Sequence, residues 1–372
     1  MTAGKRIPPD LPRGGTATLA LVGEAPGKTE IARGRPFCGP SGRLLNALLR
    51  RAGLSRWDCL VTNALDFKLP KNDIKAVATL TKAEARKALK EWETANGEHP
   101  FADHVLTPVA AGAYLPPDIV AEQLGRVRDE LAATQPTVVV PMGGTGMWAC
   151  LGVPGSGKVE KLRGSINQEV LTGRKAVPTY HPAAVMRQYG LRVPLLMDLS
   201  KAQNEAAKGP EIELPTRRLL VPETPADIRD WIADNLTDPG TLLATDIETF
   251  KGQIDCIGFA SSRLEALTIP FINVPDFTSY WSDPADEAEA LRYTAEILMG
   301  PWPKLLQYGT YDIQWIWERW GIPVLNYEQD TRLLHHALYP ELPKDLATLG
   351  ATYENERGWK ILNSRKEDKR DA

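Results

Sequence analysis

The chain has 372 residues, which is enough for two domains that each bury a hydrophobic core. With 43% apolar and 24% charged residues it has an ordinary globular composition, and no apolar run approaches the roughly 18 residues that span a membrane. The first 15 residues lack the apolar core of a signal peptide, and the four isolated cysteines form neither a disulfide framework nor a CxxC metal pair. We therefore expect a cytoplasmic protein with no membrane partner.

The net charge of −3 hides an asymmetry between the two halves of the chain. Residues 1–210 carry 28 Lys and Arg against 19 Asp and Glu, whereas residues 211–372 carry 16 against 28. A basic first half suits a polyanion such as nucleic acid. The acidic second half would repel one unless some of its carboxylates hold cations. Ordinary variation in surface charge is the alternative interpretation.

Strand-like and helix-like runs alternate through the first half of the sequence. The strand candidates are 18–23, 58–65, 137–143 and 176–182, and the helix candidates are 41–54 and 121–134. This alternation predicts an α/β fold with a mostly parallel sheet covered by helices on both faces. The leucines of the first helix form one apolar stripe, and Gly53 is a candidate for its C-terminal cap.

Two segments depart from this rhythm and set the expected domain organisation. Residues 66–118 combine a polar helical stretch with a loop-like stretch, which we interpret as an insertion between core elements. Residues 209–218 are polar and interrupted by proline, which predicts a linker. We expect a first domain at 1–208 and a second at 219–372.

The segment GVPGSGKV at 152–159 nearly matches the phosphate-binding loop G-x-x-x-x-G-K-[ST]. Its last position is Val159, which has no hydroxyl to hold magnesium, and the segment follows a predicted helix where such a loop follows a strand. We therefore interpret it as a surface loop.

Polar side chains follow three of the predicted strands. Glu24 follows the first strand, Asn63 ends the second and His181 follows the last, while Phe37 lies in the glycine-rich segment after Glu24. In open α/β sheets ligands bind beyond the carboxyl ends of the strands. The sequence therefore predicts a pocket there that offers a carboxylate, an amide, an imidazole and an aromatic face.

The motifs around these residues resemble the uracil-DNA glycosylase superfamily, and within it family four. The matching segments, in order between about residues 16 and 205, are GEAPG, GRPFCGPSGRLL, VTN, KLRG and YHPAAVMR. The resemblance implies an N-terminal α/β/α sandwich that removes uracil from DNA and leaves an abasic site.

The resemblance also implies roles for the candidate residues. Phe37 would stack on the flipped uracil, and Asn63 would accept from its N3–H and donate to its O4, a pattern that cytosine reverses. His181 would donate toward O2 as charge builds on the leaving base. Glu24 would orient water or stabilise the cationic sugar. For each, a structural role is the alternative: Phe37 in the core, Asn63 in a turn, His181 as a histidine with satisfied hydrogen bonds.

Four further residues enter through the same resemblance. Gly23 and Ala25 would bring the backbone close to the uracil, and Arg163 and Arg187 are candidate contacts to DNA phosphates. The cluster-bearing family places cysteines before the first strand and after the asparagine, whereas this chain has none before residue 19 and none between Cys59 and Cys150. We therefore predict no iron–sulfur cluster and no cofactor for the glycosylase. The insertion would take over the scaffolding role of the cluster.

The second half begins with three strand candidates, at 241–250, 254–260 and 266–271, followed by helical patterns at 286–299 and 310–321. Asp246 and Glu248 lie two apart on the first strand, so both point to one face, and Asp312 begins the last helix. Such carboxylates suit Mg²⁺ or Mn²⁺.

This half resembles the 3′–5′ exonuclease domain of the DNA polymerase I family, an RNase H-like fold, over residues 219–360. TDIET and the segment QDTRLL carry the resemblance, with Asp330 in the second of them. The resemblance implies two-metal hydrolysis of a terminal phosphodiester. The last motif of that family, a Tyr-x-x-x-Asp further downstream, is not found after QDTRLL, and its HN-x-x-FD motif reads QYGTYD here. We expect an incomplete exonuclease-like module.

The leading hypothesis is a uracil-DNA glycosylase fused to an incomplete exonuclease-like module, acting on uracil-containing DNA that is single- or double-stranded. Such a fusion suggests replication or repair in a virus of bacteria, and hence the host cytoplasm. One alternative is a protein that recognises uracil in DNA without cutting it and docks a DNA polymerase. Another is an exonuclease completed by a partner chain.

Overall fold

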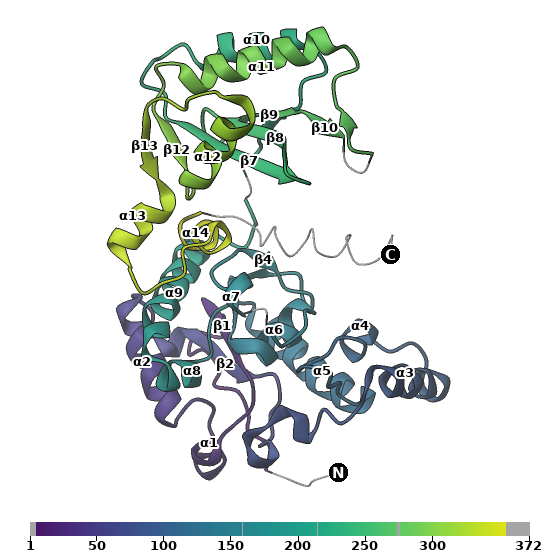
Figure 1. Ribbon diagram of the computed structural model, residues 1–372. Helices are drawn as coiled ribbons and strands as arrows, with labels where there is room; N and C mark the ends of the chain where they lie inside the picture. The colour runs from purple at the N-terminus through teal and green to yellow at the C-terminus, as the bar shows by residue number, and fades with distance from the viewer. Residues whose placement is uncertain (1–4, 158, 214, 274–275, 355–372) are drawn as a thin grey trace. The chain divides into compact units, whose positions relative to one another are not determined.

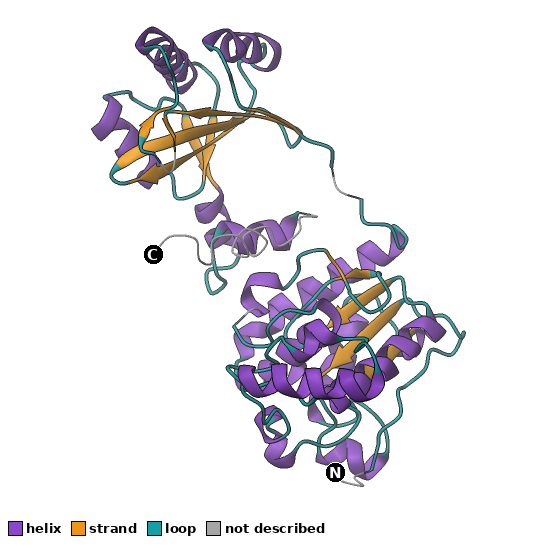
Figure 2. Cartoon of the chain, turned by 90° about the vertical axis from the view of Figure 1, so that its right-hand side faces the viewer, coloured by secondary structure: helices purple, strands orange, loops and turns teal. Residues whose placement is uncertain are grey.

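The computed structural model describes residues 5–157, 159–213, 215–273 and 276–354. Its contacts divide the chain into a first unit, Met1–Glu213 with Ala347–Ala372, and a second unit, Leu214–Leu346. Each unit is an α/β structure built around one main sheet, which confirms the predicted fold class (Figures 1 and 2). No helix among the described residues is long and apolar enough to cross a membrane.

The first unit contains a five-stranded sheet in the order β2-β1-β3-β5-β4. Its strands are β1 (Leu19–Gly23), β2 (Cys59–Asn63), β3 (Val138–Pro141), β4 (Asn167–Gln168) and β5 (Lys175–Ala176). All neighbouring pairs are parallel except β4 and β5. Gly23 is opposite Asn63 and Val22 is opposite Pro141, so the carboxyl ends of the three central strands lie level.

Helices cover both faces of this sheet (Figure 2). They are α1 (Lys28–Arg33), α2 (Pro40–Arg51), α5 (Pro117–Thr134), α6 (Gly143–Leu151), α7 (Val159–Leu162), α8 (Pro182–Arg187) and α9 (Arg192–Ala207). Alternate residues of β1 enter two separate cores: Ala20 and Val22 join one with the leucines of α5, and Leu19 and Leu21 join the other with those of α2. Gly53, just beyond α2, has a φ of 75°, which a residue with a side chain rarely adopts.

The insertion at 66–118 is more ordered than its sequence pattern predicts. It forms two 3₁₀ turns at Pro70–Asn72 and Ile74–Ala76, then α3 (Lys82–Asn96) and α4 (Ala102–Val105). A capping box between Thr81 and Glu84 starts α3, whose Ala85 and Leu89 are buried. Both helices contact α5. Part of the stretch expected to be loop is therefore helical, because α4 buries His104 and Val105.

The second unit contains a six-stranded sheet in the order β13-β12-β7-β8-β9-β6. Its strands are β6 (Arg218–Leu220), β7 (Leu243–Phe250), β8 (Gln253–Ala260), β9 (Glu265–Pro270), β12 (Lys304–Leu306) and β13 (Tyr327–Asp330), with a separate pair β10 (Ile272–Asn273) and β11 (Thr278–Ser279). The antiparallel run β7-β8-β9 and the parallel run β7-β12-β13 share the central strand, as in the RNase H-like fold. The apolar sides of α10 (Pro225–Asn235), α11 (Pro284–Met299) and α12 (Thr310–Trp320) share a core with this sheet.

Two short helices follow the last strand. Asp330 caps α13 (Thr331–Leu338), accepting hydrogen bonds from the backbone N–H groups of Arg332 and Leu333. The next helix, α14 (Leu346–Tyr353), belongs by its contacts mainly to the first unit. There Nζ of Lys201 on α9 donates to the carbonyl oxygen of Ala351 over 2.6 Å.

Candidate functional site

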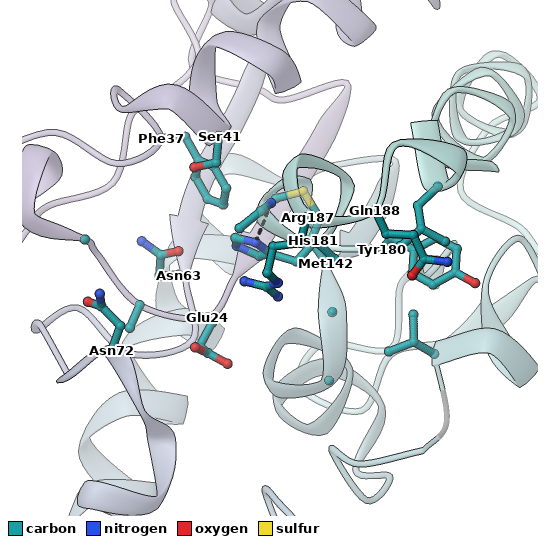
Figure 3. A pocket seen from close by; sticks show the side chains of 18 of the residues that line it. Glu24, Phe37, Ser41, Asn63, Asn72, Met142, Tyr180, His181, Arg187 and Gln188 are labelled. Carbon is teal, nitrogen blue, oxygen red and sulfur yellow. Dashed lines mark hydrogen bonds between the residues drawn. The ribbon is translucent and has the colours of Figure 1, made fainter. Parts of the chain in front are cut away.

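A pocket of about 640 Å³ opens at the carboxyl ends of the strands of the first unit (Figure 3). Glu24, Phe37, Asn63, His181 and Arg187 all line it, although up to 163 positions separate them in the chain. The site therefore lies where the topology of an open parallel sheet places a ligand. Its volume is in the range of small-molecule pockets.

Glu24 follows the last residue of β1 and directs its carboxylate into the pocket (Figure 3). Its Oε2 accepts a hydrogen bond of 2.7 Å from Oγ1 of Thr145, in the first turn of α6. A carboxylate held by one neutral hydroxyl keeps acceptor capacity for a water molecule or a cationic group.

Phe37 has a strained backbone, with a φ of 45°, and is only 4% exposed. Arg56 holds this conformation by donating to the carbonyl oxygens of Pro36 (2.7 Å) and Phe37 (3.1 Å). The tip of the ring lies against Gly23, where an added Cβ would come within 2.4 Å of Cζ. Gly42 permits an equally close approach of the Phe37 carbonyl to α2. Glycine is thus required at both positions to seat the aromatic ring in the pocket wall.

Asn63 is the last residue of β2 and is 5% exposed. Its backbone carbonyl accepts a hydrogen bond of 2.7 Å from Nη2 of Arg126. Its carboxamide forms no hydrogen bond with any part of the chain that the structure describes, and it lines the pocket. A buried amide needs partners for both its donor and its acceptor, so this side chain presents a pattern for a polar ligand to complete.

His181 precedes α8 and caps it, with Nδ1 accepting from the backbone N–H of Ala183 over 3.2 Å. Burial, reinforced by the charge of Arg187, lowers the pKa of His181 to about 4. The ring is therefore neutral at physiological pH, and with Nδ1 as acceptor its proton resides on Nε2. The imidazole lies 5.5 Å from the ring of Phe37, centroid to centroid, and offers one N–H donor.

The remaining residues predicted for this site divide into two groups. Ala25 lines the pocket, and Gly23 packs beneath it between Phe37 and Asn63. Arg163 does not fit its predicted contact with a DNA phosphate, because it is 4% exposed and its Nη2 pairs with Oδ1 of Asp198 over 2.6 Å. A guanidinium satisfied inside the protein is not available to a phosphate in this conformation.

Several residues of the pocket carry no signal in the sequence pattern. They include Ser41, Asn72, Gly157, Val159, Glu160 and Gln188. Asn72 comes from the insertion, and Gly157 and Val159 come from the glycine-rich segment that we interpreted as a surface loop. An added Cβ on Gly144 in α6 would lie 1.8 Å from the carbonyl oxygen of Gly155, so a glycine of α6 lets Gly155 pack directly on this helix. Gly157 and Val159 thus lie on the pocket rim.

The second unit brings its three predicted carboxylates to one region without forming a metal cage. Asp246 and Glu248 are exposed on the same face of β7. Asp312 is buried and accepts a hydrogen bond of 3.1 Å from the backbone N–H of Ile247. Burial raises the pKa of Asp312 to about 6, and the charge of Asp246 adds to that effect. The oxygen donors suit Mg²⁺ or Mn²⁺, but among the described residues no three acidic, His or Cys side chains converge enough to hold an ion.

The sequence profile of the Uracil DNA glycosylase superfamily matches residues 11–204, which contain every residue of the pocket described above. The chain belongs to this superfamily. A type-4 uracil-DNA glycosylase from Thermotoga maritima is 28% identical over 191 residues, which are 50% of this chain and 76% of the relative. A type-4 uracil-DNA glycosylase from Pyrobaculum aerophilum is 30% identical over 188 residues, or 49% of this chain and 74% of the relative.

Solved structures aligned with the chain include exonucleases. Escherichia coli RNase D matches with a TM-score of 0.26 and 17% identity, over 37% of this chain and 33% of that one. The exonuclease domain of EXD2 matches with a TM-score of 0.26 and 16% identity, over 42% of this chain and 78% of that one. TM-scores this low support no conclusion, so the fold of the second unit rests on its own strand order.

The cysteines of this superfamily member are distributed over separate elements. Cys59 and Cys150 are buried, and Cys38 and Cys256 are partly buried. Burial raises the pKa of the Cys59 thiol to about 12, which keeps it protonated. The prediction of no iron–sulfur cluster stays a prediction.

Proposed function

We propose that the protein is a uracil-DNA glycosylase, which hydrolyses the N-glycosidic bond of uracil in DNA and leaves an abasic site. The observation that carries the proposal is the pocket itself. In a chain of this superfamily, an aromatic ring, a carboxamide, a neutral imidazole and a carboxylate from four separate segments line one cavity.

The proposed binding step places the flipped base between Phe37 and Asn63. Stacking of a base on an aromatic ring contributes about 1–3 kcal/mol, which offsets much of the cost of extruding a nucleotide. The Asn63 carboxamide, which has no hydrogen bond with the described chain, would accept from N3–H and donate to O4. Cytosine would face this amide with donor against donor and acceptor against acceptor, so it would leave buried polar groups unpaired.

In the proposed bond cleavage, two residues on opposite sides of the scissile bond stabilise the opposite charges that develop on the base and on the sugar. As the glycosidic bond breaks, negative charge develops on the base, and Nε2–H of His181 donates a hydrogen bond to O2 without transferring its proton. Positive charge develops on the sugar, and the Glu24 carboxylate stabilises it and orients the attacking water. The low pKa of His181, about 4, supports a neutral donor in this role.

DNA is the proposed substrate also on electrostatic grounds. Arg187 lies at the pocket and is exposed, so it is positioned to contact a phosphate beside the flipped nucleotide. The excess of basic residues in 1–210 would add favourable, salt-dependent attraction to the backbone. Both single- and double-stranded substrates belong in the test.

The activity is tested by incubating the full chain with a labelled oligonucleotide that carries one uracil, followed by alkali to cleave abasic sites. We expect a shorter labelled product from uracil-DNA and none from the same oligonucleotide with cytosine. Intact oligonucleotide from both single- and double-stranded substrates, where a known glycosylase cuts them, would reject the proposal. Tight binding with an intact glycosidic bond would favour a recognition protein.

A second candidate activity belongs to the exonuclease-like unit, which we propose to be a separate domain. The first unit gives way to the second between residues 213 and 214, inside the expected linker 209–218, which supports this division. The domain would end near residue 346. Asp246, Glu248 and Asp312 on one side of the sheet favour binding of Mg²⁺ or Mn²⁺. A further ligand would have to come from elsewhere, and a polymerase is a candidate partner. Manganese-dependent shortening of 3′ ends that Asp246→Ala abolishes would support this activity.

A further inference from the structure

The pocket contains one hydrogen bond that joins Glu24 to a residue with no assigned role. We propose that Thr145 is a positioning residue for the excision reaction, because its hydroxyl holds the Glu24 carboxylate in its reactive orientation. The inference rests on the proposed glycosylase activity and concerns the same site.

The contact is short and buried. Oγ1 of Thr145 lies 2.7 Å from Oε2 of Glu24, and Thr145 is only 3% exposed. No other hydrogen bond to this carboxylate comes from the residues that the structure describes. Thr145 therefore determines which oxygen of Glu24 is engaged by protein and which one is left to face the pocket.

The surrounding backbone holds Thr145 in place. An added Cβ on Gly146 would lie 2.5 Å from the carbonyl oxygen of Val22, so α6 packs directly on the strand that leads to Glu24. Gly143 has a φ of 76° and would place a Cβ 2.9 Å from Cβ of His181. The first turn of α6 thus packs against both the segment that carries Glu24 and the segment that carries His181. Threonine splits between two rotamers in a helix, and the hydrogen bond to Glu24 selects one of them.

A hydrogen bond donated to a carboxylate by a fixed hydroxyl restrains the direction in which the carboxylate points. Losing the Thr145 hydroxyl should therefore lower the excision rate, because the Glu24 carboxylate is no longer held in its reactive orientation.

The test compares Thr145→Val, which keeps the shape and loses the hydroxyl, with Thr145→Ser, which keeps the hydroxyl. We expect Thr145→Val to lower the single-turnover excision rate about 10- to 100-fold, the range for losing a hydrogen bond to a charged group. Its affinity for uracil-DNA should change less than its rate. Thr145→Ser should recover most of the rate.

Two controls separate positioning from stability. Thr134→Val removes another buried threonine hydroxyl of this unit, one that donates to the carbonyl oxygen of Glu130 over 2.8 Å, and should leave excision unchanged. In a Glu24→Gln background, Thr145→Val should add no further loss, because its effect passes through Glu24.

The outcomes are distinguishable. An inactive wild-type chain would reject the proposed function and this inference with it. An active wild type with a Thr145→Val variant that matches it in rate would reject the inference alone. A loss of rate in Thr145→Val that serine does not recover, or that comes with a reduced melting temperature and an equal loss of affinity for uracil-DNA, would mean that Thr145 is only structural.

Discussion

The pocket of the first unit and the acidic face of the second unit both place carboxylates at the edge of a sheet, but their surroundings differ. Around the pocket, four kinds of side chain converge, and hydrogen bonds or close glycine contacts from neighbouring elements hold each of them. In the second unit, Asp246 borders a mostly apolar groove of about 370 Å³, whereas Asp312 is buried and does not line it. Motifs in the right order are therefore not equivalent to a formed site, which requires convergence of the side chains.

Substituting one carboxylate in each unit should give the largest difference in excision rate between variants of the two units. Glu24→Gln keeps the shape but loses the charge, and we expect excision to fall about 10²- to 10⁴-fold, the usual range for a positioned acid or base. Asp246→Ala in the second unit should leave excision unchanged. Single-turnover rates on uracil-DNA measure both. An equal loss in the two variants would remove the functional distinction between the units.

Arg56 acts as a clamp on the strained loop that contains Phe37, and it should contribute a large part of the local stability. Arg56→Met removes a guanidinium that binds Asp10 and two carbonyl oxygens, and should cost about 3 kcal/mol of unfolding free energy, as breaking a buried ion pair does. Arg35 pairs with the same Asp10 but is more exposed, so Arg35→Met should cost less than about 1 kcal/mol. Urea unfolding measures both, and similar costs would show that the clamp does not support the loop.

Removing the amide at the end of β2 should weaken recognition of uracil without unfolding the pocket. We expect Asn63→Ala to lower the excision rate about 10- to 100-fold, because buried polar groups on the base lose their partners. The melting temperature should change little, since Arg126 binds the backbone carbonyl of Asn63 and not its side chain. A variant that excises uracil at the wild-type rate would show that another residue reads the base.

Two aspartates of the second unit should respond to substitution with opposite signs. The folded pKa of Asp312, about 6, lies above its unfolded value. Ionised Asp312 therefore destabilises the folded unit, and this destabilisation grows as the pH rises from about 4 to 6. Asp312→Asn should therefore stabilise the unit at pH 7 by about 1–2 kcal/mol and by less at pH 4.

Asp330 is the matched control for that substitution. Hydrogen bonds from Tyr327 and from the backbone of Gly309 and Leu333 outweigh burial and hold its pKa below the usual range. Asp330→Asn should therefore destabilise at pH 7, and the loss should shrink as the pH falls. Melting curves at both pH values check the signs. Equal signs for the two variants would contradict the electrostatic difference between these carboxylates.

The smallest expected effect concerns His181, whose pKa of about 4 lies below the unfolded value of about 6.5. In that interval the unfolded chain binds more protons, so this residue contributes stability that is present above pH 6.5 and is lost as the pH falls toward 4. The excision rate should show no inflection near pH 6.5 from this residue. An NMR titration of the ring, assigned by His181→Asn, measures the pKa, and a value near 6.5 would contradict a neutral, buried donor.

Much of the pocket could be predicted from sequence because parallel strands end at one edge of a sheet. Glu24, Asn63 and His181 follow strand-like runs, and the structure brings all three to one pocket. Prediction failed where a distant residue decides the outcome, as for Arg163, which pairs with Asp198, 35 positions later. Of the strand expected at 176–182, only Ala176 lies in a strand, β5.

The sequence by itself determined the α/β class, the order of the motifs and which side chains end the strands, because these depend on local periodicity and short spacings. Only the tertiary structure decided which polar groups are satisfied inside the protein and which face the cavity. It brought Asn72, Gly157 and Val159 to the rim and placed the hydroxyl of Thr145 on Glu24. The contact between Thr145 and Glu24 joins residues 121 positions apart, and packing, rather than any short-range preference of the chain, selects it.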